Sequence, residues 1–299
     1  MLLLGAHCID TGGIPMAARR AGQGGMQALQ IFSAIPKYYN DKVGVKPDRQ
    51  ARFAEALADA GIPSSQVIVH AAYVLNCATP DPEKWARAAA GLAKEFERST
   101  TLGVGGVCFH PGAATDGDRD AACDRVAEAM RRALAATPEG ATRLLIENTA
   151  GAGTTVGRTP DEIARMLDGI PAAARARVGY GLDTCHLFAS GFPIAESRAA
   201  LTEVLDAFER ATGEPPAFLH LNDSEGALGS NRDRHMRIGE GQIGAAPFGW
   251  LLQDHRAQGI PLILETPQAV SEVADDDATA DPWDVESIAL LRALASGEK

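Results

Sequence analysis

Short apolar runs recur along the whole chain, and a longer stretch with the spacing of an amphipathic helix follows each run. The runs are almost continuous in apolar residues, which is typical of strands buried on both faces of a parallel sheet. We therefore predict eight strands, at residues 2–7, 26–32, 66–70, 104–110, 143–147, 178–183, 217–221 and 260–265.

The stretches between these runs carry the signals of α-helices. Residues 49–62 are rich in Ala, Leu, Arg and Glu at helical spacing. Thr159 is placed as an N-cap whose capping box Glu162 completes, and Asp281 opens the last predicted helix before a proline. Eight strand–helix alternations predict a single α/β domain over residues 1–299, folded as a (β/α)8 TIM barrel. A doubly wound open sheet is the alternative, but no Gly-x-Gly-x-x-Gly follows the first strand.

Polar, titratable side chains end seven of the eight apolar runs, each time at the C-terminal side. They are His7, His70, His110, Glu147, Asp183, His220 (one residue before its run ends) and Glu265, and His186, Asp233 and His235 follow shortly downstream. In a barrel these strand ends surround one mouth, where active sites are built. So many carboxylates and imidazoles would be costly to desolvate without a compensating cation. We therefore expect metal ions there, with His7 either supporting the ligands or packing in the core.

The types of ligand narrow the choice of metal. Imidazole and carboxylate without thiolate suit zinc, manganese or iron, whereas calcium and magnesium prefer oxygen ligands alone. Five histidines and four carboxylates, leaving His7 aside, are too many for one ion and fit about two or three. Two or more metals close together are the usual machinery for hydrolysis of phosphoesters.

Composition and charge restrict the function further. The formal net charge of the 299-residue chain is −11, so its overall field does not attract nucleic acid, and a polyanion must be held by local cations or metals. None of the five cysteines forms a Cys-x-x-Cys pair, which predicts reduced thiols in a cytoplasmic protein. No apolar run approaches the ~20 residues of a membrane span, and the first residues lack the basic region of a signal peptide. We expect no membrane association.

Seven motifs, in order along the chain, resemble the endonuclease IV family of zinc-dependent apurinic/apyrimidinic endonucleases. The Asp-Thr-Cys-His motif and the pattern His-Leu-Asn-Asp…Asp-Arg-His…Gly-Glu-Gly are highly specific, whereas the glycine-rich stretches alone are not. The resemblance spans nearly the whole chain, from Leu3 to about Pro267. The motifs are LLGAHCIDTGG, VIVHAAYVLN, FHPGA, LLIENTAGAGTTVG, GLDTCHLFASG, FLHLNDSEGALGSNRDRHMRIGEGQIG and PLILETP.

This resemblance implies three Zn²⁺ ions per chain, because all nine zinc-binding positions of the family hold the expected type of residue. Glu147 would bridge the first two ions. The implied sets are His70, His110 and Glu147 for the first ion, Glu147, Asp183, His220 and Glu265 for the second, and His186, Asp233 and His235 for the third.

The implied reaction is hydrolysis of the phosphodiester on the 5′ side of an abasic site in duplex DNA, leaving a 3′-hydroxyl. Glu147 and Glu265 would be the catalytic carboxylates, with Glu265 orienting the attacking water or accepting its proton. Divalent ions lower the pKa of water toward neutrality. Three of them also add about six positive charges at one spot, which reconciles the acidic chain with a DNA substrate. No protein partner is expected.

The resemblance also suggests DNA contacts. Arg234 would contact a backbone phosphate, and Tyr73 matches a family residue that inserts at the abasic gap, although an aromatic residue there could instead pack. After the second strand the family usually has a basic, amide-rich stretch ending in Arg-Gln-Trp, but residues 32–40 read FSAIPKYYN. Lys37 takes the place of the arginine, so we expect one phosphate contact and an apolar wedge there.

Two other functions remain open from the sequence. A metal-dependent sugar isomerase or epimerase of the related xylose isomerase-like barrels also has a carboxylate-rich mouth, but it needs fewer histidines and gives Asp233 and His235 no role. A barrel that only binds metal or nucleic acid is the non-enzymatic alternative. The number of bound metal ions would distinguish an endonuclease from the isomerase or epimerase. Cleavage of an abasic duplex would distinguish it from both alternatives.

Overall fold

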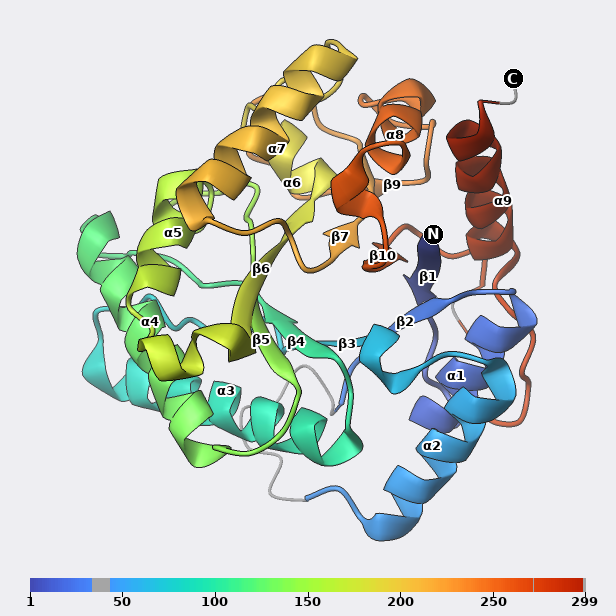
Figure 1. Cartoon of the computed structure of the whole chain (residues 1–299), viewed down its shortest axis with the longest axis horizontal. Coiled ribbons are helices and arrows are strands. Elements are labelled where there is room, and N and C mark those ends of the chain that lie inside the picture. The colour runs from blue at the N-terminus through green and yellow to red at the C-terminus, as the bar shows by residue number, and fades with distance from the viewer. Residues whose placement is uncertain (34–43, 271, 298–299) are drawn as a thin grey trace.

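A computed structural model describes residues 1–33, 44–270 and 272–297 of the chain. Eight parallel strands close into a barrel in the order β1-β10-β7-β6-β5-β4-β3-β2, and helices surround it (Figure 1). This confirms the predicted (β/α)8 barrel. The strands are β1 (Leu3–His7), β2 (Ala28–Ile31), β3 (Val67–His70), β4 (Gly106–Phe109), β5 (Arg143–Glu147), β6 (Val178–Asp183), β7 (Leu219–His220) and β10 (Pro261–Leu264).

The helices that follow these strands begin where the sequence supplies capping groups. Thr159 and Glu162 form the predicted capping box of α5, and the Asp281 side chain accepts the Trp283 amide at the start of α9. The helices are α1 (Ile14–Gln23), α2 (Pro47–Ala60), α3 (Pro82–Leu102), α4 (Arg119–Ala136), α5 (Pro160–Asp168), α6 (Thr184–Ala189), α7 (Arg198–Thr212), α8 (Ala245–Leu252) and α9 (Pro282–Ser296). Within the described ranges, none of them is long and apolar enough to cross a membrane.

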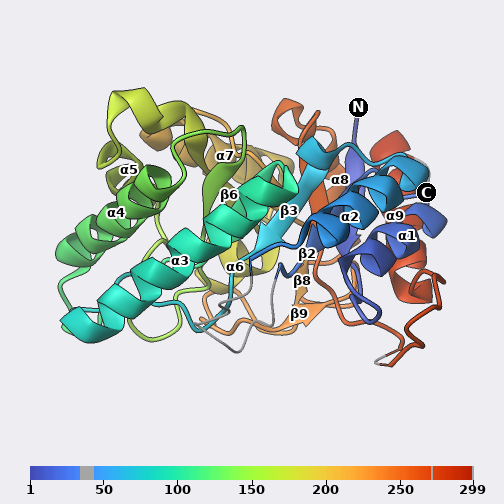
Figure 2. The ribbon, with the colours of Figure 1, turned by 90° about the horizontal axis from the view of Figure 1, so that it is seen from below.

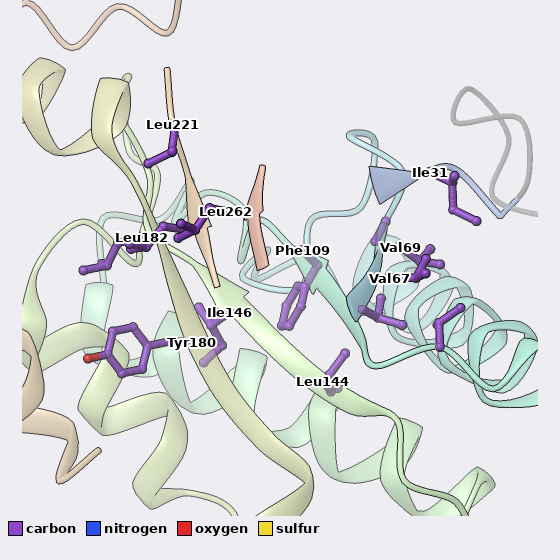
Figure 3. Close-up of a cluster of buried hydrophobic side chains, with 14 of the residues drawn as sticks. Ile31, Val67, Val69, Phe109, Leu144, Ile146, Tyr180, Leu182, Leu221 and Leu262 are labelled. Atoms are coloured by element: carbon purple, nitrogen blue, oxygen red, sulfur yellow. The ribbon is translucent and has the colours of Figure 1, made fainter. Parts of the chain in front are cut away.

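The side chains of each strand alternate between two cores. One set points outward and packs against the helices, including Val67, Val69, Ile146 and Tyr180 (Figure 3). The other set fills the barrel in two small clusters, which are Ile68, Cys108, Leu145 and Phe218, and Leu3, Ala28 and Ile263. Because the alternation has a period of two, the next inward position on each strand lies at the mouth.

The narrow barrel interior requires a glycine beside its largest side chain. A Cβ atom on Gly181 would lie 2.1 Å from the ring of Phe218, so only glycine fits there. Phe218 is completely buried and supports His220, the inward residue two positions further along the chain, with the ring centroids 4.8 Å apart.

The structure departs from the sequence expectation after β7. The predicted strand at residues 217–221 pairs only over Leu219–His220. The chain then forms a small antiparallel hairpin of β8 (Asp223–Ser224) and β9 (His235–Met236), which no periodic pattern marks. Figure 2 shows this hairpin beyond the ends of the barrel strands, on the same side as α6.

Candidate functional site

A cavity of about 470 Å³ opens at the mouth formed by the C-terminal strand ends, with His70, His186 and Glu265 in its wall. The structure brings all nine expected ligands together here. Six line the cavity, and Glu147, Asp183 and His220 lie completely buried directly beneath them. Their convergence follows in part from the alternation of the strands, because six of them either end a barrel strand or directly follow its last residue.

Glu147 lies at the centre of this arrangement. Its Oε2 atom is 3.2 Å from Nε2 of His70 and 3.2 Å from Nε2 of His110. Its Oε1 atom is 2.9 Å from Nδ1 of His220. The two oxygens of one carboxylate therefore face two different groups of ligands, as a carboxylate that bridges two ions must.

Backbone carbonyls orient three of the histidines. The Nδ1 atom of His70 lies 2.7 Å from the Ala71 carbonyl oxygen. Nδ1 of His186 lies 2.8 Å from the carbonyl of Asn148, and Nδ1 of His235 lies 3.0 Å from that of Glu265. A ring nitrogen that donates to a carbonyl leaves the other nitrogen free as a ligand. In all three rings, Nε2 is therefore the nitrogen that is free to bind a metal ion.

A second group of ligand atoms in the mouth is equally compact. Ligand atoms of Glu147, Asp183, His220 and Glu265 all lie within 4.8 Å of one another. The Asp183 carboxylate is fixed by hydrogen bonds from the His186 backbone amide, at 2.9 Å, and the Asn222 side chain, at 2.6 Å. These four residues match the set that the resemblance implies for the second ion.

The expected third set meets through Asp233. Its two carboxylate oxygens lie 3.3 Å from Nε2 of His186 and 3.1 Å from Nε2 of His235. These two buried Nε2 atoms have no well-formed hydrogen bond to any described residue. Buried polar atoms are nearly always satisfied, so two such nitrogens beside a carboxylate fit a metal ion. Cys185 adds a sulfur near Asp233 and His235, a neighbour that the sequence reasoning did not anticipate.

Electrostatics show how strongly the groups of the mouth interact without metal. Burial opposes protonation of His70, but its hydrogen bond to Glu147 and the charges of Glu147 and Glu265 together outweigh burial and raise its pKa from 6.5 to about 9. Burial also opposes protonation of His235, but the charges of Asp183 and nearby Asp233 raise its pKa to about 9. Burial would raise the pKa of Glu147. The neighbouring imidazoles, His220 first among them, nevertheless lower this pKa well below its usual value. Divalent ions would take the place of these protons.

The β8–β9 hairpin explains how His220 and His235, far apart in the sequence, reach the same mouth. Ser224 pairs with His235 in the hairpin, so the chain leaves β7 and returns to the mouth. The Asp223 side chain accepts hydrogen bonds from five backbone amides, those of Ser224, Gly239, Gly241, Ile243 and Gly244. A Cβ atom on Gly241 would lie 2.5 Å from Asp223 Oδ1, so the second glycine of the Gly-Glu-Gly motif is needed for this close approach.

Sequence reasoning missed two amide side chains at the site. Asn222 connects strand ends, because its Nδ2 donates to Asp183 and its Oδ1 accepts the Glu265 amide at 2.8 Å. Gln30 is completely buried among the ligands. A glutamine on an inward position of an otherwise apolar strand was the signal that could have found it. His7 supports the site, with Nδ1 3.0 Å from Gln30 Nε2 and 3.9 Å from Glu265 Oε1.

The expected DNA contacts lie at the rim of the same cavity. Tyr73 is 62% exposed, and the centroid of its ring lies 5.2 Å from that of the His70 ring. Arg234 is exposed and lines the cavity, with Nη1 donating to the Asp233 carbonyl at 2.8 Å. Lys37 lies outside the residues that the structure describes.

Comparisons with known proteins agree with this geometry. Residues 17–294 match the family described as xylose isomerase-like TIM barrel. A protein of Geobacter sp. (strain M21) named probable endonuclease 4 is 35% identical over 298 residues, covering 99% of this chain and all of that protein.

Solved structures give the same result. The crystal structure of endonuclease IV from Thermus thermophilus is 31% identical, covers 98% of this chain and 99% of its own, and superposes with a TM-score of 0.80. A D-tagatose 3-epimerase-like protein has a TM-score of 0.70 at 15% identity, over 99% of this chain and 97% of its own, and shares the fold alone. The chain belongs to the endonuclease IV family of xylose isomerase-like TIM barrels.

Proposed function

We propose that this chain is a DNA-repair endonuclease that hydrolyses the phosphodiester 5′ to abasic sites in duplex DNA and leaves a 3′-hydroxyl. The arrangement of Glu147 carries the proposal, because its two oxygens face separate groups of ligands at 3.2 Å and 2.9 Å. A bridged pair of ions suits phosphodiester hydrolysis. The name of the Geobacter relative, probable endonuclease 4, points to the same class of reaction.

The metal centre that we propose holds three Zn²⁺ ions. Bound zinc would lower the pKa of an attacking water and neutralise charge that develops on the phosphate. The ligands are the three sets that the resemblance implies, and the two unsatisfied Nε2 atoms of His186 and His235 support the third set. Imidazole and carboxylate ligands fit zinc better than calcium or magnesium.

The carboxylates would have distinct tasks in the reaction. Glu147, completely buried and surrounded by histidines, would hold the bridged pair at a fixed separation. Glu265 lines the cavity, so its carboxylate can reach a water above the strand ends and accept its proton. Only Glu265 of these two has access to substrate.

The rim residues would hold the DNA. Arg234 projects from the hairpin loop as an exposed cation for a backbone phosphate, and Lys37 would add a second phosphate contact. Tyr73, an exposed aromatic ring beside His70, would fill the gap left by the missing base. We also propose that residues 1–299 act as one domain, and that the five free, buried cysteines reflect a reducing cytoplasm.

The decisive experiment is incubation with a duplex that carries one synthetic abasic site, with and without a chelator. We expect a single cut on the 5′ side with a 3′-hydroxyl, abolished by chelation and restored by zinc. Elemental analysis of the active protein should give close to three ions per chain, mostly zinc. One tightly bound ion in an active sample would overturn the trinuclear centre, and sugar epimerisation without strand cleavage would favour the epimerase alternative.

A further inference from the structure

Gln30 occupies an inward strand position at the mouth but is not among the expected ligands. It lies on β2, is completely buried, and pairs in register with His7 of β1. Burial of an uncharged amide is costly unless its donors and acceptor are all used. The hydrogen bonds of this amide therefore indicate which neighbouring atoms are donors and which are acceptors.

The amide of Gln30 touches two residues of the same metal-ligand set. Its Nε2 atom donates to Oε1 of Glu265, and its Oε1 atom lies 2.7 Å from Nε2 of His220. An ionised carboxylate can only accept, so the Gln30 atom that faces Glu265 must be the NH₂ group. The carbonyl oxygen must then face His220, and the Nε2 atom of His220 must carry a proton.

The second hydrogen of the same NH₂ group is also used. It points to Nδ1 of His7 at 3.0 Å. The side chain therefore makes three hydrogen bonds to these residues, and the Cys108 thiol adds a long, weak one to Oε1 at 3.8 Å. With Nε2 protonated, His220 can bind metal only through Nδ1. That atom lies 2.9 Å from Glu147 Oε1 and 3.2 Å from Glu265 Oε2, at the centre of the proposed second set.

This arrangement is the reverse of that in the other oriented histidines. His70, His186 and His235 donate from Nδ1 to backbone carbonyls and present Nε2. A backbone carbonyl is present whatever the side chain, whereas the orientation of His220 depends on the identity of residue 30.

We propose that Gln30 is a positioning residue of the metal centre, which fixes the tautomer of His220 and the rotamer of Glu265 for the same ion. The inference rests on the proposed metal centre but not on the DNA substrate. Hydrogen-bond partners of ligands typically change metal affinity by about 10–100-fold. Gln30 acts on two ligands at once, so we expect the upper part of that range for the ion held by His220.

The test is zinc retention and nitrogen NMR of the histidine rings, both measured without DNA. In the zinc-loaded wild type, His220 should be protonated at Nε2, whereas His186 and His235 should be protonated at Nδ1. A zinc-loaded wild type with the His220 proton on Nδ1 would overturn the proposal without any variant. If zinc is lost together with the NMR signals of Nε2-protonated His220, the lost ion is the one that His220 holds.

Two variants of Gln30 separate its contact with His220 from its contact with Glu265. Gln30→Met keeps the length of the side chain and removes all of its amide hydrogen bonds. We expect about 100-fold weaker retention of the ion held by His220, with the ion at His186 and His235 unaffected. Gln30→Glu keeps the acceptor for His220, so it should restore the Nε2-protonated ring although it opposes Glu265. Ile31→Val, a buried change on the outward face of the same strand, is the control and should retain zinc as the wild type does.

Each result bears on the proposal independently of DNA cleavage. Equal zinc retention in Gln30→Met and Ile31→Val would show that Gln30 only packs. Selective zinc loss in Gln30→Met, in a protein whose wild type fails to cut abasic DNA, would support the role of Gln30 and reject the proposed function.

Discussion

At the scale of single residues, four histidines of the mouth present a defined nitrogen because their other ring nitrogen has a fixed partner. His70 is held by its neighbouring carbonyl and His220 by a side chain from another strand. Glu147 contributes differently, because each of its oxygens faces different imidazoles. The consequences of substitution should therefore depend on how many groups a residue serves.

Glu147→Gln should reduce abasic-site cleavage more than His235→Ala at saturating zinc. Glu147 faces both ligand groups of the bridged pair, whereas His235 faces Asp233 and would hold one ion. Loss of one ligand of the outer ion should weaken its binding by about 10–100-fold or more, which added zinc can partly restore. Single-turnover rates measured against zinc concentration make the comparison, and equal residual rates would contradict a bridging role.

Zinc loading should release protons at pH 7.5. The pKa of His70 and of His235 is about 9 in the metal-free protein, because neighbouring carboxylates outweigh burial, so both rings carry a proton at that pH. Zinc requires neutral imidazole, so each must lose its proton on binding. Zinc affinity should consequently fall as the pH is lowered below about 9. Calorimetry in buffers of different ionisation enthalpy measures this release, and identical heats in all buffers would refute it.

At the scale of elements, the β8–β9 hairpin places residues from one long loop at two corners of the mouth. Asp223 anchors it by accepting five backbone amides while completely buried. The hairpin has only two residue pairs, which is too short for independent stability. Its position is therefore set by this carboxylate rather than by its own pairing.

Asp223→Asn should destabilise the protein by about 3 kcal/mol, because the new NH₂ group faces backbone donors and leaves them unsatisfied. It should also weaken the ion at Asp233 and His235, since Ser224 pairs directly with His235. Chemical denaturation and zinc retention measure the two effects. Asp118→Asn is the matched control, because Asp118 caps α4 at the surface and Asn caps equally well. A similar small change in both variants would exclude the anchoring role.

At the scale of the whole molecule, the charge is concentrated unevenly. The formal net charge is −11, and four of the carboxylates lie at the mouth where DNA would bind. Bound divalent ions would reverse the local sign there. The rest of the acidic surface repels DNA, so the chain should hold its substrate through few contacts, all close to the cavity.

Tyr73→Ala should lower the preference for abasic over intact duplex while leaving zinc retention unchanged. The ring is exposed at the rim and lies beside the rings of His70 and His110, but it supplies no ligand atom, so its removal should leave the ligands in place. Competition binding with matched duplexes gives the ratio of affinities. An unchanged ratio would show that the tyrosine only packs and that the wedge lies elsewhere.

Lys37→Ala should reduce the salt dependence of DNA binding by about one unit of slope, because one phosphate contact releases about one counterion. The rate of cleavage in the bound complex should stay nearly unchanged. Binding titrations at several salt concentrations test this, with Lys94→Ala on α3, which pairs with Glu97, as the control. The same slope in the wild type and Lys37→Ala would remove Lys37 from the DNA interface.

The sequence by itself determined the barrel and most of its mouth. Nearly continuous apolar runs fix buried parallel strands, and their period of two fixes which residue ends each strand facing inward, as for His70 and Glu147. Such local periodicity can be read without neighbours. Contacts between distant segments cannot, because a side chain such as Gln30 becomes a partner of His220 only once the barrel closes. The tertiary structure alone therefore decided which ring nitrogen each oriented histidine presents to the site and which ligands each oxygen of Glu147 faces. It also decided the position of the hairpin held by Asp223.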